Sequence, residues 1–284
     1  MRKVIQKLET NYTQSPVMLR GYYRETVNEN GAFIKYTDAS LETHYDGYRK
    51  KEYKWKDFRV AGLGNVGSLS SFNYFSGARL HRIHFHFRTI ANDQVKIIDS
   101  RSSDNLTTTA MNANIEGGPL SILGRDRLKY KQSFLGEKKF KQFDYELGEV
   151  RMPGKGWVYV LSFRTKITAE EMEATSTKGR KRWNKAHKNK LLQGQIFIDQ
   201  DDYAVLKYEC SVPSDLKQYF CGYKTMAIKH FDYKLTVEYQ KEGDRYYLKK
   251  MRHEDEFIYK DTISNNTTPY NAVCELWVTS IEKE

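Results

Sequence analysis

Two alternating runs near the middle of the chain restrict most strongly what it can fold into. They cover residues 156–163 and 194–199, and the second continues after a turn into residues 203–209. Each run is rich in aromatic and β-branched residues, is bounded by Gly, Pro or Asp, and is too short for a helix. Each therefore predicts a β-strand.

Similar runs recur along nearly the whole chain. The expected strands span residues 17–28, 32–45, 80–90, 94–101, 140–150, 157–166, 192–199, 203–212, 227–239, 245–259 and 271–281. Short helical segments are expected at 1–11, at 119–130, and after Thr168, where Glu171 completes a capping box. An antiparallel sheet this large must curl, split or close on itself. The pattern thus predicts a mainly β protein with one large curved antiparallel sheet, or half-open barrel, and a few short helices.

The composition agrees with a folded chain. The 284 residues include 21 Tyr and 14 Phe, and disordered chains are poor in aromatic residues. No clean boundary divides the sequence, so we expect a single β-rich domain over residues 1–284. The stretch of Ser, Thr, Asn and Gly at residues 102–118 is the expected seam if there is one.

The net charge of +11 is distributed mostly at alternate positions of the expected strands, where it indicates solvated faces. One basic cluster stands apart, and it consists of Lys178, Arg180, Lys181, Arg182, Lys185, Lys188 and Lys190. Charged blocks are usually solvated, so we interpret this cluster as an exposed basic rim, with nucleic-acid binding as the less favoured alternative.

Cysteine usage and hydropathy bear on location. Cys210, Cys221 and Cys274 are too few for a disulfide framework, although Cys210 and Cys221 could bridge a turn in an exported protein; buried free thiols are the alternative. No run approaches the ~18 apolar residues of a membrane-spanning helix. The first ten residues lack the apolar core of a secretory signal, so we expect either a cytosolic protein or a piece of a longer precursor.

Three motifs with the spacing of functional sites are better explained without chemistry. Gly62–Gly67 has the glycine spacing of a dinucleotide site but lacks a β-α-β context. His84 and His86 would share a strand face, with His81 nearby, but the neighbouring Arg82 and Arg88 oppose a metal ion. Glu254 and Glu256 would share a face while Asp255 points away, and a solvated strand face explains them best. We predict no metal and no cofactor.

Three blocks of the sequence together resemble a known family. They are Asn11–Tyr45, with Gly21–Glu25 and Tyr36–Ala39; Gly117–Leu120 with Asp126–Lys129 and Phe134–Leu135; and Gly156–Phe163 with Gly194–Asp199 and Tyr203–Val205. Together they are similar to the β-rich region that follows a carboxypeptidase-regulatory-like domain in exported proteins of Gram-negative bacteria. The third block is also similar to the outer-membrane lipoprotein-carrier fold, an unclosed barrel with a helical lid and an apolar concave face.

This resemblance implies a cell-envelope protein, in the periplasm or associated with the outer membrane, and it implies no peptidase activity. The chain departs from the family pattern in two places. The family pattern places a signal peptide and a regulatory-like domain ahead of this region, so we expect the sequence to be a piece of a longer precursor. The basic insert after Lys166 is longer than the family pattern.

The sequence favours a non-enzymatic binding or scaffold module. Its concave face would hold a lipid, a lipoprotein or a segment of an envelope protein partner, with the basic rim attracting anionic head groups. The residues expected to line this face are Trp157, Tyr159, Leu161, Phe163, Ile196 and Ile198. Ordinary core packing is the competing interpretation of the same residues. The alternative function is a glycan or ester hydrolase that uses carboxylates or histidines from separate strands, such as Glu254, Glu256 or His84.

Overall fold

The computed structural model describes residues 2–45, 47–48, 95–104, 122–123, 125–129, 137–176, 191–217, 228–260 and 266–283. The strands are β1 (Val17–Glu29), β2 (Ala32–Tyr45), β3 (Val95–Asp104), β4 (Phe143–Met152), β5 (Gly156–Thr165), β6 (Gln193–Asp199), β7 (Val205–Ser211), β8 (Ile228–Glu242), β9 (Arg245–Lys260) and β10 (Thr267–Lys283). The helices are α1 (Arg2–Asn11) and α4 (Ala169–Ser176), with 3-10 turns η3 (Arg127–Lys129), η4 (Glu137–Gln142) and η5 (Ser214–Leu216).

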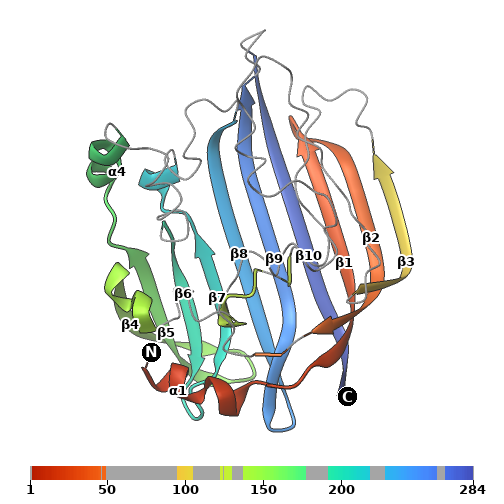
Figure 1. Cartoon of the computed structure of the whole chain (residues 1–284), viewed down its shortest axis with the longest axis vertical. Coiled ribbons are helices and arrows are strands. Elements are labelled where there is room, and N and C mark those ends of the chain that lie inside the picture. The colour runs from red at the N-terminus through yellow and green to blue at the C-terminus, as the bar shows by residue number, and fades with distance from the viewer. Residues whose placement is uncertain are drawn as a thin grey trace.

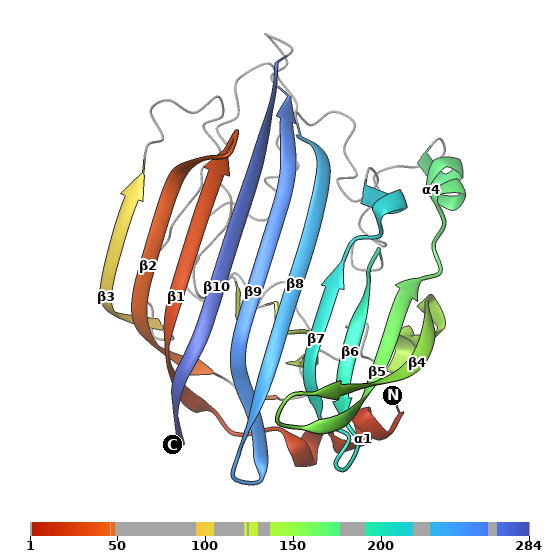
Figure 2. The same ribbon diagram turned by 180° about the vertical axis from the view of Figure 1, so that it is seen from behind.

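The ten described strands form one unclosed, curved antiparallel sheet in the order β3-β2-β1-β10-β9-β8-β7-β6-β5-β4 (Figures 1 and 2). The expected fold class is therefore confirmed. Strand β10, the last in the chain, lies between β1 and β9 and joins the N-terminal strands to the rest of the sheet. None of the described helices combines the length and hydropathy needed to cross a membrane.

Local sequence explains where the strands turn. Asn30 and Gly31, between β1 and β2, have φ angles of 51° and 81°. A two-residue type I′ hairpin turn requires positive φ at both of its central residues. At the start of α4, the Thr168 hydroxyl accepts from the Glu171 amide and the Glu171 carboxylate accepts from the Thr168 amide. The expected capping box is thus confirmed.

Other expected elements have mixed outcomes. The strand expected at 94–101 is β3. Of the helical segment expected at 119–130, Ile122 and Leu123 are helical and η3 follows. The strand expected at 80–90 lies outside the described residues, and so does the expected seam apart from residues 102–104, which belong to β3.

One face of the sheet carries the core, and we call it the inner face because residues 125–129 lie on it (Figure 1). A single row of paired residues runs along this face through all ten strands from β4 to β3. Its members are Leu147, Leu161, Ile196, Tyr208, Val237, Met251, Leu276, Tyr23, Ala39 and Ser100. The members from Leu161 to Ala39 are all buried, so this apolar row forms the centre of the core.

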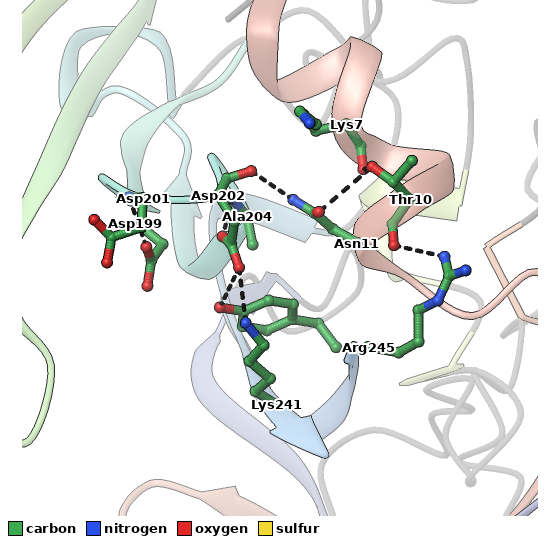
Figure 3. A network of polar contacts seen from close by, with 10 residues as sticks. Lys7, Thr10, Asn11, Asp199, Asp201, Asp202, Ala204, Lys241 and Arg245 are labelled. Carbon is green, nitrogen blue, oxygen red and sulfur yellow. Dashed lines mark hydrogen bonds and ion pairs between the residues drawn. The ribbon is translucent and has the colours of Figure 1, made fainter. Parts of the chain in front are cut away.

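Helix α1 is fixed across the end of the sheet where the β6–β7 and β8–β9 turns lie (Figures 1 and 3). The Asn11 side-chain amide donates to the Asp202 carbonyl at 2.8 Å, and Arg245 donates to the Thr10 carbonyl at 2.5 Å. The Asp202 carboxylate in turn accepts from Lys241 at 3.1 Å. These hydrogen bonds join the C-terminal end of α1 to the β6–β7 and β8–β9 turns, which are far from α1 in the sequence.

Candidate functional site

A buried carboxylate fixes the segment that crosses the inner face. Asp126 is fully buried, and its two oxygens accept hydrogen bonds from the hydroxyls of Tyr45 at 2.6 Å and Tyr239 at 2.7 Å. The Leu128 amide donates to the same carboxylate at 3.0 Å. Tyr45 on β2 and Tyr239 on β8 are four strand spacings apart, about 19 Å in a flat sheet, and the curvature brings both within reach of Asp126.

The tyrosines around Asp126 form a packed aromatic group. The Tyr12 and Tyr48 rings have centroids 4.7 Å apart, and both rings also contact Tyr239. Burial raises the pKa of Tyr45 and Tyr239 well above the ordinary value, so both hydroxyls stay protonated and act as donors. At this end of the inner face, Asp126 therefore has its hydrogen bonds from Tyr45, Tyr239 and Leu128, while the buried Tyr48 hydroxyl has no hydrogen-bond partner among the described residues.

The centre of the inner face contains a second row in which the sheet changes from apolar to polar. From β4 to β8 the row consists of Tyr145, Phe163, Gly194, Cys210 and Leu235. From β9 to β2 it consists of His253, Cys274, Glu25 and Thr37, which we call the polar row. All four members of the polar row are at least nine-tenths buried. Polar side chains at this burial normally need partners.

Arginines of the crossing segment lie beside the polar row. The Arg125 guanidinium is 5.9 Å from the centroid of the Tyr233 ring, and this ring is 5.0 Å from the His253 ring. Burial, assisted by the nearby charge of Arg125, lowers the pKa of His253 below its ordinary value of 6.5, although Asp255 opposes this shift. His253 is therefore neutral at pH 7.

Several buried atoms of this region have no hydrogen-bond partner among the described residues. They are Thr37 Oγ1, His253 Nε2, Asp255 Oδ1 and Arg127 Nε. His253 Nε2 and Asp255 Oδ1 lie 3.0 Å apart, and this contact is an ion pair only when His253 is protonated. Buried polar atoms without partners are few in native proteins and often mark a site that binds water or a ligand. The polar row and these neighbours form the candidate site.

The candidate site contains the residue types of a nucleophilic triad but not their activation. Cys274 and His253 are paired directly across β10 and β9, and Asp255 lies next to His253 Nε2. Burial raises the pKa of the Cys274 thiol well above its ordinary value. Nucleophilic cysteines need the opposite shift, because the thiolate is the reactive form. The arrangement therefore supports binding better than acyl transfer.

The acidic pair considered from the sequence lies on the opposite, outer face. Glu254 accepts from Asn271 at 3.1 Å and from Arg252 at 3.2 Å, and Glu256 lies 3.6 Å from Lys234. Burial opposes ionisation of Glu254, but these hydrogen bonds hold its pKa below the ordinary value. Asp255 points away, as expected. The alternative hydrolase function stays a prediction.

The six residues predicted to line a ligand face are placed together on β5 and β6. Tyr159 pairs with Ile198 and Leu161 with Ile196, so these four side chains lie on one face of the sheet. Leu161, Phe163, Ile196 and Ile198 are buried in the core cluster, Tyr159 packs against it, and Trp157 is 60% exposed. A role for these residues in ligand contact stays a prediction.

Other predicted sites lie outside the described residues. These are the basic rim (Lys178, Arg180, Lys181, Arg182, Lys185, Lys188, Lys190), Gly62–Gly67, His81, His84, His86 and Cys221. Cys210 and Cys274 are free and buried, and burial raises the pKa of Cys210 to about 12. Sequence reasoning missed Thr37, Arg125, Arg127 and His253 as site residues.

Comparisons with known proteins give no family assignment. No protein-family model matches the chain, and a search of curated proteins finds no match. Among solved structures the chain is similar to lipovitellin, from work on lipid–protein interactions in that protein, with a TM-score of 0.32 and 10% sequence identity. The alignment covers 95% of this chain and 26% of lipovitellin, so the chain spans about a quarter of that protein. A TM-score this low carries no argument about function.

Proposed function

We propose that this chain is a non-enzymatic binding or scaffold module of the cell envelope. Its ligand is an amphiphile, such as a lipid or the acylated part of a lipoprotein, and the inner face of the sheet is the binding face. The resemblance to the β-rich region of exported Gram-negative proteins supports an envelope location, in the periplasm or at the outer membrane.

The observation that carries the proposal is the group of unpartnered polar atoms in an otherwise apolar interior. Among the described residues, Thr37 Oγ1 on the polar row and Arg127 Nε of the crossing segment have no hydrogen-bond partner, and His253 Nε2 has only its 3.0 Å contact with Asp255 Oδ1. The apolar row runs next to the polar row. A ligand with an apolar part and a polar part matches this division of the inner face.

The donor or acceptor character of these buried atoms indicates which chemical groups the head group of the ligand contains. Arg127 Nε can only donate, whereas the Thr37 hydroxyl can donate and accept. Hydroxyl and amide groups also donate and accept, so they match this mixture better than a bare phosphate or carboxylate does. The proposed head group is therefore rich in hydroxyl or amide groups.

Native mass spectrometry of gently purified protein, followed by lipid extraction, tests the proposal. We expect a co-purifying amphiphile, and less of it in Thr37→Val and Asp255→Asn variants. Thr236→Val, on the outer face of β8, is the matched control and should retain the ligand. The proposal is wrong if the protein carries no amphiphile and takes none up from mixed micelles of monoacylglycerol, phospholipid and fatty acid.

A further inference from the structure

We propose that β4 is a docking edge for an extended segment of another protein, which joins the sheet as an additional strand. The segment would carry Lys or Arg and apolar residues at defined positions. This surface is independent of the inner-face ligand, because β4 lies five strands away from the β9 residues of the candidate site.

The backbone of β4 is suited to strand addition. In the part of the chain that the structure describes, β4 pairs with β5 on one side and ends the sheet on the other. Its ten residues contain no proline, so every residue carries an amide donor. Half of the backbone groups of an edge strand point outward, and an added strand satisfies them.

The side chains of β4 leave apolar surface uncovered beside this free edge. Leu147 is 66% exposed and Val150 is 39% exposed. Leu147 pairs with Leu161 and continues the apolar row of the inner face, whereas Val150 lies three residues further along and faces the other side. A strand laid against β4 would cover apolar groups on both faces of the sheet.

The charge of β4 indicates the chemistry of the segment. On a chain of net charge +11, β4 carries three carboxylates (Asp144, Glu146, Glu149) and one basic residue, Arg151. Asp144 lies 3.3 Å from Lys166, but Glu146 has no ion pair among the described residues. Among the described residues, Glu149 accepts a side-chain hydrogen bond from the neutral Gln200 alone. Within the part of the chain that the structure describes, two carboxylates at this edge therefore have no cationic partner.

Strand β3, at the opposite edge of the sheet, lacks this excess of carboxylates over basic residues. Strand β3 carries two basic and two acidic residues, and its basic residues are already neutralised by β2. Lys96 lies 3.2 Å from Glu42, and Arg101 lies 2.9 Å from Asp38. Basic residues on an edge strand protect it from pairing. The two edges thus differ in the features that decide whether another strand is accepted.

The order of charged and apolar residues along β4 predicts a sequence pattern for the docking segment. Residues opposite Glu146 and Glu149 should be basic, and residues opposite Leu147 and Val150 should be apolar. The five positions opposite residues 146–150 then follow the order basic, apolar, any, basic, apolar. A parallel partner has this order from its N-terminus, and an antiparallel partner has it reversed.

Binding of two fluorescent heptapeptides, one in each order with Lys and Val in the pattern and Thr elsewhere, tests the proposal by anisotropy. We expect one order to bind, and the Glu146→Lys/Glu149→Lys variant to weaken it by about tenfold, since two attractive cross-strand pairs become repulsive. Ile98→Lys on β3, where Ile98 is 56% exposed, is the matched control and should leave binding unchanged.

A second pair of measurements separates strand addition from charge attraction and from self-association. N-methylation of alternate peptide amides removes backbone donors and should abolish binding, while the Lys side chains remain. Equal binding of the methylated peptide would overturn the proposal. Sedimentation velocity of the protein alone should show a monomer; a dimer that the double variant dissociates would assign this edge to a second copy and overturn the separate partner.

Discussion

Replacement of Thr37 by Val removes one buried hydroxyl and keeps the shape of the side chain. Thr37 is 2% exposed, and its Oγ1 has no hydrogen-bond partner among the described residues. A buried hydroxyl without a partner costs about 1–3 kcal/mol, so the ligand-free variant should exceed the wild type in unfolding free energy by about this amount. Each kcal/mol raises the Tm of a chain near this size by about 2–4 °C. A core substitution to a less polar residue should thus stabilise the protein.

Calorimetry before and after removal of bound amphiphile on a hydrophobic resin measures this effect. We expect the full gain in the stripped protein and a smaller gain in the loaded protein, because there the wild-type hydroxyl bonds the ligand. Thr236→Val on the outer face should change the unfolding free energy by less than about 0.5 kcal/mol. A lower Tm of stripped Thr37→Val would refute the reasoning, since the hydroxyl would then have a partner.

Three further substitutions test the structure that surrounds the candidate site. Asp126→Ala removes the acceptor of three buried hydrogen bonds and should cost at least about 2 kcal/mol in chemical denaturation. Gly194→Ala should disrupt β6–β7 pairing in circular dichroism, because its Cβ would lie 1.9 Å from the Glu209 carbonyl oxygen. Gly148→Ala, whose Cβ would lie 3.9 Å from the Val160 carbonyl oxygen, should be tolerated. The lowered pKa of His253 stabilises the fold above about pH 6.5, and this contribution is lost as pH falls; His253→Phe should flatten that loss in pH-dependent unfolding.

Most of the sheet could be predicted from the sequence because its signals are local. Alternation identified the strands, and Asn30-Gly31 and the Thr168 capping box marked where elements turn or begin. The strand order could not be predicted in the same way. Pairing of β1 with β10 joins residues more than 230 positions apart, and no local signal specifies it.

The candidate site was harder to predict because it depends on those distant pairings. In β9, Met251, His253 and Asp255 alternate with Arg252 and Glu254, so the sequence alone places His253 on the face of a core methionine. That signal indicates a buried histidine. It cannot show that Thr37, three strands away, shares the same row, or that Arg127 reaches it from a crossing segment.

The position of β10 has a consequence for how the molecule assembles. During synthesis β1 to β3 and β4 to β9 emerge first, but these two groups share no hydrogen-bonded boundary until residues 267–283 are released from the ribosome. Until then β1 and β9 each present a bare flank that another nascent chain could capture. Completion is a single late insertion, and a chain truncated before Thr267 would leave the edges of β1 and β9 unpaired and prone to aggregate.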